Sequence, residues 1–167
     1  MPHKVSFASM AYDGGNYIYV AGDKRRGGWM QRMDLRTGEW LDMALLPQNI
    51  RCYPTTVNSL APISGPIYAC GSQCRGDGLA CASYSATEGG PSGQWTASVP
   101  QLSQSDAFRA PMAKCAGSLF AFPYYIDKEA TASVEKLDEE GKRWQKLGTK
   151  VPEGLKHFAA VCHQYYV

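Results

Sequence analysis

Residues 15–47 read GNYIYVAGDKRRGGWMQRMDLRTGEWLDMALLP, and the order of strands and turns is clearest in this stretch. A β-rich run ends at a glycine, a polar loop follows, and a second alternating run leads through a turn to Trp40. Alternation of apolar and polar residues is typical of half-buried strands, and glycine-containing turns between such runs are typical of hairpins. The stretch therefore predicts several short antiparallel strands.

The same pattern returns downstream at a nearly constant spacing. Three tryptophans mark it: Trp40, Trp95 and Trp144. They are separated by 55 and 49 residues, and the apolar runs that precede them begin at Ile18, Ile67 and Leu119, at steps of 49 and 52. A fourth run, 165–167, follows after another 46 residues. Two features that keep one period indicate a repeated structural unit.

Each copy contains the same parts in the same order. We expect first strands at 7–12, 53–57, 110–114 and 158–162, each followed by a short turn and a second strand. A loop, a third strand and another turn then lead to the tryptophan. The complete copies end at Pro47, Pro100 and Pro152, and proline blocks continuation of a strand ladder. Four short antiparallel strands in a unit of this length are typical of one β-propeller blade.

Two stretches, YIYVAGD…MQRMDLRTGEWLDMALLP and VEKLDEEGKRWQKLGTKVP, resemble kelch repeats. The family signature is a glycine pair that ends the second strand, followed by a tyrosine and a tryptophan about seven residues apart. Here the tryptophan is present in all three complete copies, whereas the tyrosine is retained only as Tyr84 and the glycine pair is nowhere intact. The resemblance implies an all-β propeller of kelch type, with four-stranded blades at 4–47, 49–100 and 105–152 and a partial blade at 154–167.

Three blades and one hairpin make up about half of a ring, since propellers close with roughly 4–8 blades. A blade cannot bury both of its faces alone, and an open end would expose apolar surface. The sequence therefore predicts a partial propeller, which is a fragment, a homo-oligomer or a subunit completed by another chain.

The composition excludes several classes of partner. Hydrophobic residues are 44% and charged residues 19% of the chain, as in globular domains. The net charge of +2 indicates no nucleic-acid or membrane partner, and no apolar stretch approaches the length of a membrane span. Since no signal peptide is visible, a cytoplasmic protein is expected, with its six cysteines as free thiols.

Basic residues recur where each first strand begins: Lys4, Arg51, Arg109 and Lys156. Three more cations fall in the loop after the second strand of the first copy. A ring of cations on one rim suits an acidic or phosphorylated peptide, although surface cations are also common without any function. Rim loops with aromatic and arginine anchors predict these partner-binding residues: Lys24, Arg25, Arg26, Arg51, Arg109, Tyr124, Tyr125 and His157.

The resemblance implies a protein–protein interaction scaffold, such as a ubiquitin-ligase substrate receptor or a cytoskeletal scaffold. Hydrolase and phosphate-loop signatures are absent from the sequence, so no catalytic residue, cofactor or metal site is assigned and a non-enzymatic protein is expected. The carboxylates Glu135, Asp138, Glu139 and Glu140 cluster around one turn, where we expect a solvated loop.

Two alternatives remain open. Some kelch-type propellers are metal enzymes, so the resemblance also allows a metal-dependent oxidase or a sugar-processing enzyme. The string CRGDGLAC at 74–81 places Arg75, Gly76 and Asp77 between two cysteines, which resembles the integrin-binding loops of disintegrins. This string indicates a secreted adhesion protein if the loop is functional, and a plain polar loop if it is not.

Overall fold

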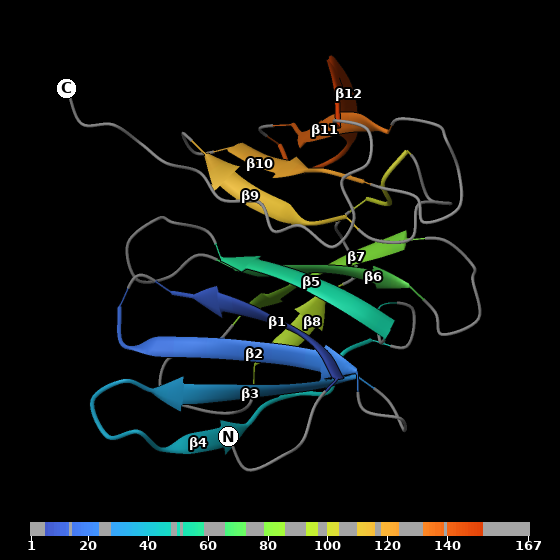
Figure 1. Ribbon diagram of the computed structural model, residues 1–167. Helices are drawn as coiled ribbons and strands as arrows, with labels where there is room; N and C mark the ends of the chain where they lie inside the picture. The colour runs from blue at the N-terminus through green and yellow to red at the C-terminus, as the bar shows by residue number, and fades with distance from the viewer. Residues whose placement is uncertain are drawn as a thin grey trace, which may run out of the picture.

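The computed structural model describes residues 6–13, 15–23, 28–47, 50, 52–58, 66–72, 79–85, 93–96, 100–103, 110–115, 118–123, 132–138 and 140–151. Within these ranges the chain is all-β and forms three open four-stranded antiparallel sheets, each with its strands in sequence order (Figure 1). This part of the chain contains no helix whose length and apolar character would let it span a bilayer.

The first sheet contains β1 (Ser6–Tyr12), β2 (Tyr17–Asp23), β3 (Trp29–Asp34) and β4 (Trp40–Asp42). The second contains β5 (Cys52–Asn58), β6 (Ile67–Ser72), β7 (Leu79–Ser85) and β8 (Gln94–Thr96). The third contains β9 (Met112–Cys115), β10 (Ser118–Ala121), β11 (Ser133–Leu137) and β12 (Trp144–Lys150). The fourth hairpin expected at 154–167 lies outside the described residues.

The three tryptophans occupy equivalent places in the three sheets. Each lies at or next to the start of the outermost strand, where Trp40 pairs with Met33, Trp95 with Tyr84, and Trp144 with Leu137. The paired residues are those that the sequence repeat aligns with one another. The expected repetition of a four-stranded antiparallel unit is therefore confirmed.

The sheets are arranged as a fan. Contacts join the first strand of one sheet to the first strand of the next, β1 to β5 and β5 to β9. No comparable set of contacts joins β4, β8 and β12 among the described residues. Figure 1 shows the sheets as successive layers, so their inner strands lie together and their outer strands diverge, in a blade-like arrangement.

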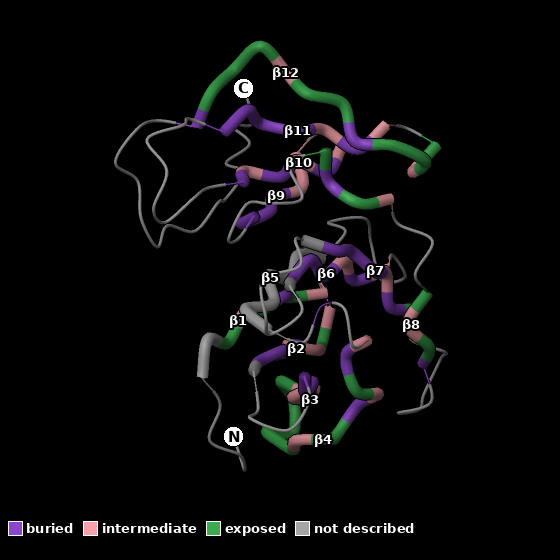
Figure 2. The backbone as a smooth tube through the Cα atoms, turned by 90° about the vertical axis from the view of Figure 1, so that its right-hand side faces the viewer, coloured by how far each residue is buried: buried purple, intermediate pink, exposed green. Residues whose placement is uncertain are grey.

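The core lies between consecutive sheets. Side chains alternate between the two faces of a strand, so Tyr19 and Ala21 face the second sheet while Val20 faces away. One apolar cluster joins Tyr19, Ala21 and Met30 of the first sheet to Ile67 and neighbouring residues of the second. A second cluster joins the second sheet to the third (Figure 2). The second sheet is thus covered on both faces.

Tryptophan also ties neighbouring sheets together through its indole N–H. Trp95 donates to the carbonyl oxygen of Ala44 at 3.3 Å, and Trp144 donates to that of Pro100 at 2.9 Å. Both acceptors lie on the segment that leaves the outermost strand of the preceding sheet. An indole that is buried or partly buried favours a hydrogen-bond partner, so this contact accounts for the tryptophan in the second and third copies.

Equivalent turns precede Trp40 and Trp144. Gly38 (φ 73°) and Gly141 (φ 68°) adopt the left-handed conformation that glycine accepts without steric cost. Their amides donate to the carbonyl oxygens of Asp34 (2.8 Å) and Asp138 (3.0 Å), the residues that begin the two turns. The Arg36 guanidinium, 2.8 Å from the Asp34 carboxylate, lowers the pKa of Asp34 to about 2.

Gly93 is required by close packing rather than by its φ angle. A Cβ at this position would come closer than 3.0 Å to the Tyr84 hydroxyl and to the backbone oxygen of Ser85. Since Tyr84 is fully buried, we expect Gly93→Ala to lower the free energy of unfolding by about 1–3 kcal/mol in urea denaturation. Gly148→Ala is the control, because its Cβ would meet no atom within 4 Å. Equal stability of the two variants would contradict this packing.

A disulfide joins Cys70 and Cys81, which face each other across β6 and β7 with their Cα atoms 4.1 Å apart. Cys115 is also disulfide-bonded. The expectation of free thiols is therefore wrong for these three cysteines. The expectation was based on the absence of a visible signal peptide. The pairing itself depends on strand register, which places Cys70 directly opposite Cys81.

Candidate binding pocket between the second and third sheets

The partner-binding residues predicted from the sequence lie outside the described residues. They are Lys24, Arg25, Arg26, Arg51, Arg109, Tyr124, Tyr125 and His157. The same holds for the candidate adhesion residues Arg75, Gly76 and Asp77. The described residues instead reveal a site that the sequence patterns do not indicate.

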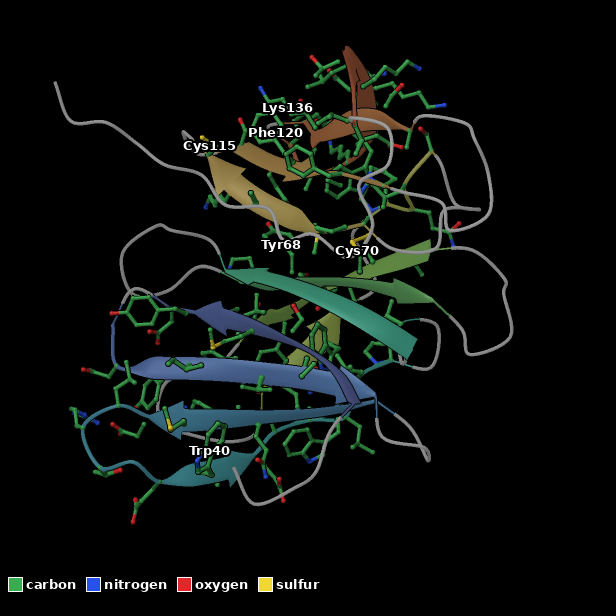
Figure 3. The ribbon with its side chains drawn as sticks, viewed as in Figure 1. Trp40, Tyr68, Cys70, Cys115, Phe120 and Lys136 are labelled. Atoms are coloured by element: carbon green, nitrogen blue, oxygen red, sulfur yellow. A yellow bond between two sulfur atoms is a disulfide. The ribbon has the colours of Figure 1, made fainter. Side chains whose placement is uncertain are left out.

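A cavity of about 300 Å³ lies between the second and third sheets. We call it the Lys114 pocket, and it is lined by Tyr68, Lys114, Ser118, Leu119, Leu137, Asp138, Glu140 and Gly141. Tyr68 comes from β6, and Figure 3 shows it in the space between the second and third sheets. The other residues come from the β9–β10 hairpin and from the turn between β11 and β12. The pocket therefore lies at one end of the sheets, where two turns of the third sheet meet the second sheet.

Register explains why Lys114 points into this space. Lys114 pairs with Leu119, just as Tyr12 pairs with Ile18 and Asn58 pairs with Ile67 in the other sheets. The repeated unit therefore supplies the position. Only the third copy places a cation there.

The ammonium group of Lys114 is partly desolvated, and no carboxylate among the described residues forms an ion pair with it. Burial lowers the pKa of Lys114, and burial raises the pKa of Tyr68, because low-dielectric surroundings disfavour the charged form of each. Among the described residues, no hydrogen bond or ion pair reaches the Lys114 ammonium. A partly desolvated cation in this state favours an anionic partner.

Each carboxylate of the pocket has a cation from its own turn beside it. Asp138 accepts a hydrogen bond from the Lys142 amide at 2.7 Å and lies 3.7 Å from the Arg143 guanidinium. Glu140 lies 2.7 Å from the Lys142 ammonium, and its side chain is 70% exposed at the mouth. The side-chain groups of this lining that can donate a hydrogen bond are the Lys114 ammonium and the hydroxyls of Tyr68 and Ser118.

Glu135 does not belong to a solvated loop, contrary to the expectation from the sequence. It is fully buried on β11, where its carboxylate accepts hydrogen bonds from the Ser103 amide at 3.0 Å and the Ser103 hydroxyl at 2.8 Å. Ser103 lies on the segment that connects the second sheet to the third. Glu135 therefore links the third sheet to the segment that precedes it, and it is not among the residues that line the Lys114 pocket.

No group of three histidine, cysteine, aspartate or glutamate side chains within the described residues is arranged to hold a metal ion. The chain was also compared with known proteins. No protein-family model matches it, and no curated protein matches it in sequence.

Proposed function

We propose that this chain is a protein-interaction module built on a kelch-like propeller, and that the Lys114 pocket holds an acidic side chain of its partner. The observation that carries the proposal is the partly buried Lys114 ammonium, which has no counter-ion among the described residues and lines the same pocket as the hydroxyls of Tyr68 and Ser118. A carboxylate or phosphate group accepts hydrogen bonds from all three groups. The blade-like sheets support the scaffold role, because such sheets hold turns rigidly at their ends.

The site fits a side chain rather than a large ligand. A cavity of about 300 Å³ is at the lower limit of small-molecule sites. Leu119 and Leu137 line it beside the donors, so the methylene groups of an acidic side chain find apolar contacts on the way to the ammonium. A partner peptide would then lie across the two turns of the third sheet.

Peptide titrations test this proposal. Acetylated and amidated pentapeptides with a central glutamate or phosphoserine are titrated against the protein by NMR, beside matched peptides with glutamine or serine. We expect only the acidic peptides to shift the resonances of Ser118 and Leu119. Lys114→Gln removes the charge at nearly constant length, and we expect it to weaken binding roughly 10-fold or more, as for hydrogen bonds to charged groups.

Lys146→Gln is the matched control, because Lys146 is an exposed lysine on β12 of the same sheet. It should leave the affinity unchanged. Equal binding of the glutamate and glutamine peptides, or full affinity of Lys114→Gln, would overturn the proposal.

The binding should also depend on pH in a defined direction. Lys114 binds an anion only when protonated, and its pKa is lowered by burial. Affinity for the glutamate peptide is therefore expected to fall as the pH rises through this lowered pKa, and thus at a lower pH than for an ordinary exposed lysine. A titration curve that stays flat up to the usual lysine range would contradict the role of Lys114.

A second candidate function has its own supporting observation. The Cys70–Cys81 disulfide closes the base of the connection between β6 and β7, the segment in which Arg75, Gly76 and Asp77 occur in the sequence. Disulfides persist in oxidising compartments, which favours a secreted protein over a cytoplasmic one. Adhesion of integrin-bearing cells to the immobilised protein tests this alternative, with Asp77→Glu as the variant that should abolish it.

A further inference from the structure

The Lys114 pocket contains the kinds of group that react with a carbonyl compound. Lys114 lies on β9, directly opposite Leu119 in the β9–β10 hairpin, so strand pairing fixes the backbone that carries its amine. The same cavity of about 300 Å³ is lined by two hydroxyl groups and two apolar side chains, those of Tyr68, Ser118, Leu119 and Leu137. One cavity thus holds a nitrogen nucleophile, hydrogen-bond donors and an apolar wall.

The Lys114 amine is available for reaction. Within the described part of the chain, no hydrogen bond or ion pair engages it. By contrast, the Lys142 ammonium lies 2.7 Å from the Glu140 carboxylate, and Lys150 donates to the Ser133 hydroxyl at 3.1 Å. The lining of the pocket therefore leaves the Lys114 nitrogen free to meet a ligand.

Desolvation also increases the share of Lys114 that is uncharged. Only about 0.1% of an ordinary lysine is unprotonated at neutral pH, and only this form is a nucleophile. Burial lowers the pKa of Lys114, so its unprotonated share is larger. Desolvation in an apolar pocket is one of the ways in which proteins activate lysine toward carbonyl carbon.

Tyr68 can supply the proton that such a reaction requires. It lines the pocket from β6, and Figure 3 shows it in the space between the second and third sheets. Burial raises the pKa of the Tyr68 hydroxyl, which therefore keeps its proton at neutral pH. A group in this state can donate a proton to an oxygen atom on which negative charge develops.

We propose that the Lys114 pocket is an imine-forming site, in which the Lys114 amine binds a small aldehyde covalently with Tyr68 as the proton donor. The Nζ lone pair attacks the carbonyl carbon, and the oxygen takes up a proton to give a carbinolamine. The C–O bond then breaks, Tyr68 protonates the departing oxygen, and the proton released by nitrogen returns to Tyr68. In total nitrogen loses two protons, oxygen leaves as water, and no atom is oxidised or reduced.

The cavity restricts the class of aldehyde by size and polarity. A volume of about 300 Å³ lies at the lower limit of ligand sites, so a short aldehyde fits better than a large one. Leu119 and Leu137, which are 5% and 6% exposed, offer apolar contacts to an alkyl chain. Apolar walls also limit the access of water, which would hydrolyse the imine. A short aliphatic aldehyde meets both conditions.

Reductive trapping on the full chain tests the proposal. The folded protein is incubated with butanal and sodium cyanoborohydride, which reduces an imine to a stable secondary amine. Mass spectrometry of the digested protein then gives the rate of modification at each lysine. We expect Lys114 to react roughly 10-fold or more faster than the exposed Lys146 and Lys150, because desolvation activates it.

Two further measurements assign this preference to the pocket. In urea the pocket is lost, so Lys114 should react no faster than Lys146. Tyr68→Phe keeps the ring and removes only the hydroxyl, so it should slow the modification of Lys114 roughly 10-fold or more, with the rate at Lys146 as the matched internal control.

Equal modification of Lys114 and Lys146 in the folded protein would overturn the imine site, as would a preference for Lys114 that persists in urea. An unchanged rate at Lys114 in Tyr68→Phe would overturn the role of Tyr68. The result is independent of the peptide titrations described above, because trapping requires the free amine and no partner.

Discussion

Replacing Trp144 by alanine is expected to lower the free energy of unfolding by about 3–5 kcal/mol, the range for a large aromatic side chain removed from a core. Trp144 is 7% exposed and packs with the second cluster of buried residues, so its loss leaves a cavity between the second and third sheets. It also leaves the Pro100 carbonyl without its indole donor. Urea denaturation followed by circular dichroism measures the change.

Two variants separate the causes of this loss. Trp144→Phe keeps most of the ring but removes the N–H donor, so we expect a cost of about 1–2 kcal/mol. Trp40→Ala should cost less than Trp144→Ala, because Trp40 is only half-buried and its indole has no acceptor among the described residues. Equal destabilisation by Trp40→Ala and Trp144→Ala would contradict the deeper burial of Trp144.

Loss of the Cys70–Cys81 disulfide is the second large effect. The bond links residues 11 positions apart, and cross-linking a loop of this size stabilises a fold by about 3 kcal/mol through restriction of the unfolded chain. Cys70→Ala/Cys81→Ala is therefore expected to lower the free energy of unfolding by about 2–4 kcal/mol in urea. Alanine is chosen because both side chains are buried, and serine would add an unpaired hydroxyl.

The single variants provide the internal control. Either substitution alone removes the whole cross-link, so the second should add little to the first. A double variant as stable as the wild type, or single effects that simply add, would show that the two sulfurs are not joined.

The repeat was predictable from the sequence because it depends on local patterns. Spacing alone placed Trp40, Trp95 and Trp144 in equivalent strands, and the register confirms it. Turn residues such as Gly38 and Gly141 identify the hairpins, since few other residues accept a positive φ. All-β sheets of four antiparallel strands follow from these features.

The site was not predictable, because it depends on contacts between copies. In the sequence, Lys114 has the pattern of an ordinary strand residue. It lines a pocket only because Tyr68 of the second sheet packs next to the third sheet. Comparison of the three copies at this position, Tyr12, Asn58 and Lys114, would have revealed the unusual cation. Glu135 was misplaced for a similar reason: its partner Ser103 is 32 residues away.

The length and charge of the outermost strands affect whether strands of other molecules can pair with them. β4 and β8 are three residues long, and β12 is longer but exposes Lys146 and Lys150 along its margin. Short or lysine-bearing borders offer a poor template for ladder extension by a foreign strand, and so they resist amyloid-like growth. A protein of this design can therefore expose apolar side chains such as Met10 and Tyr12 while its outermost strands resist fibril formation.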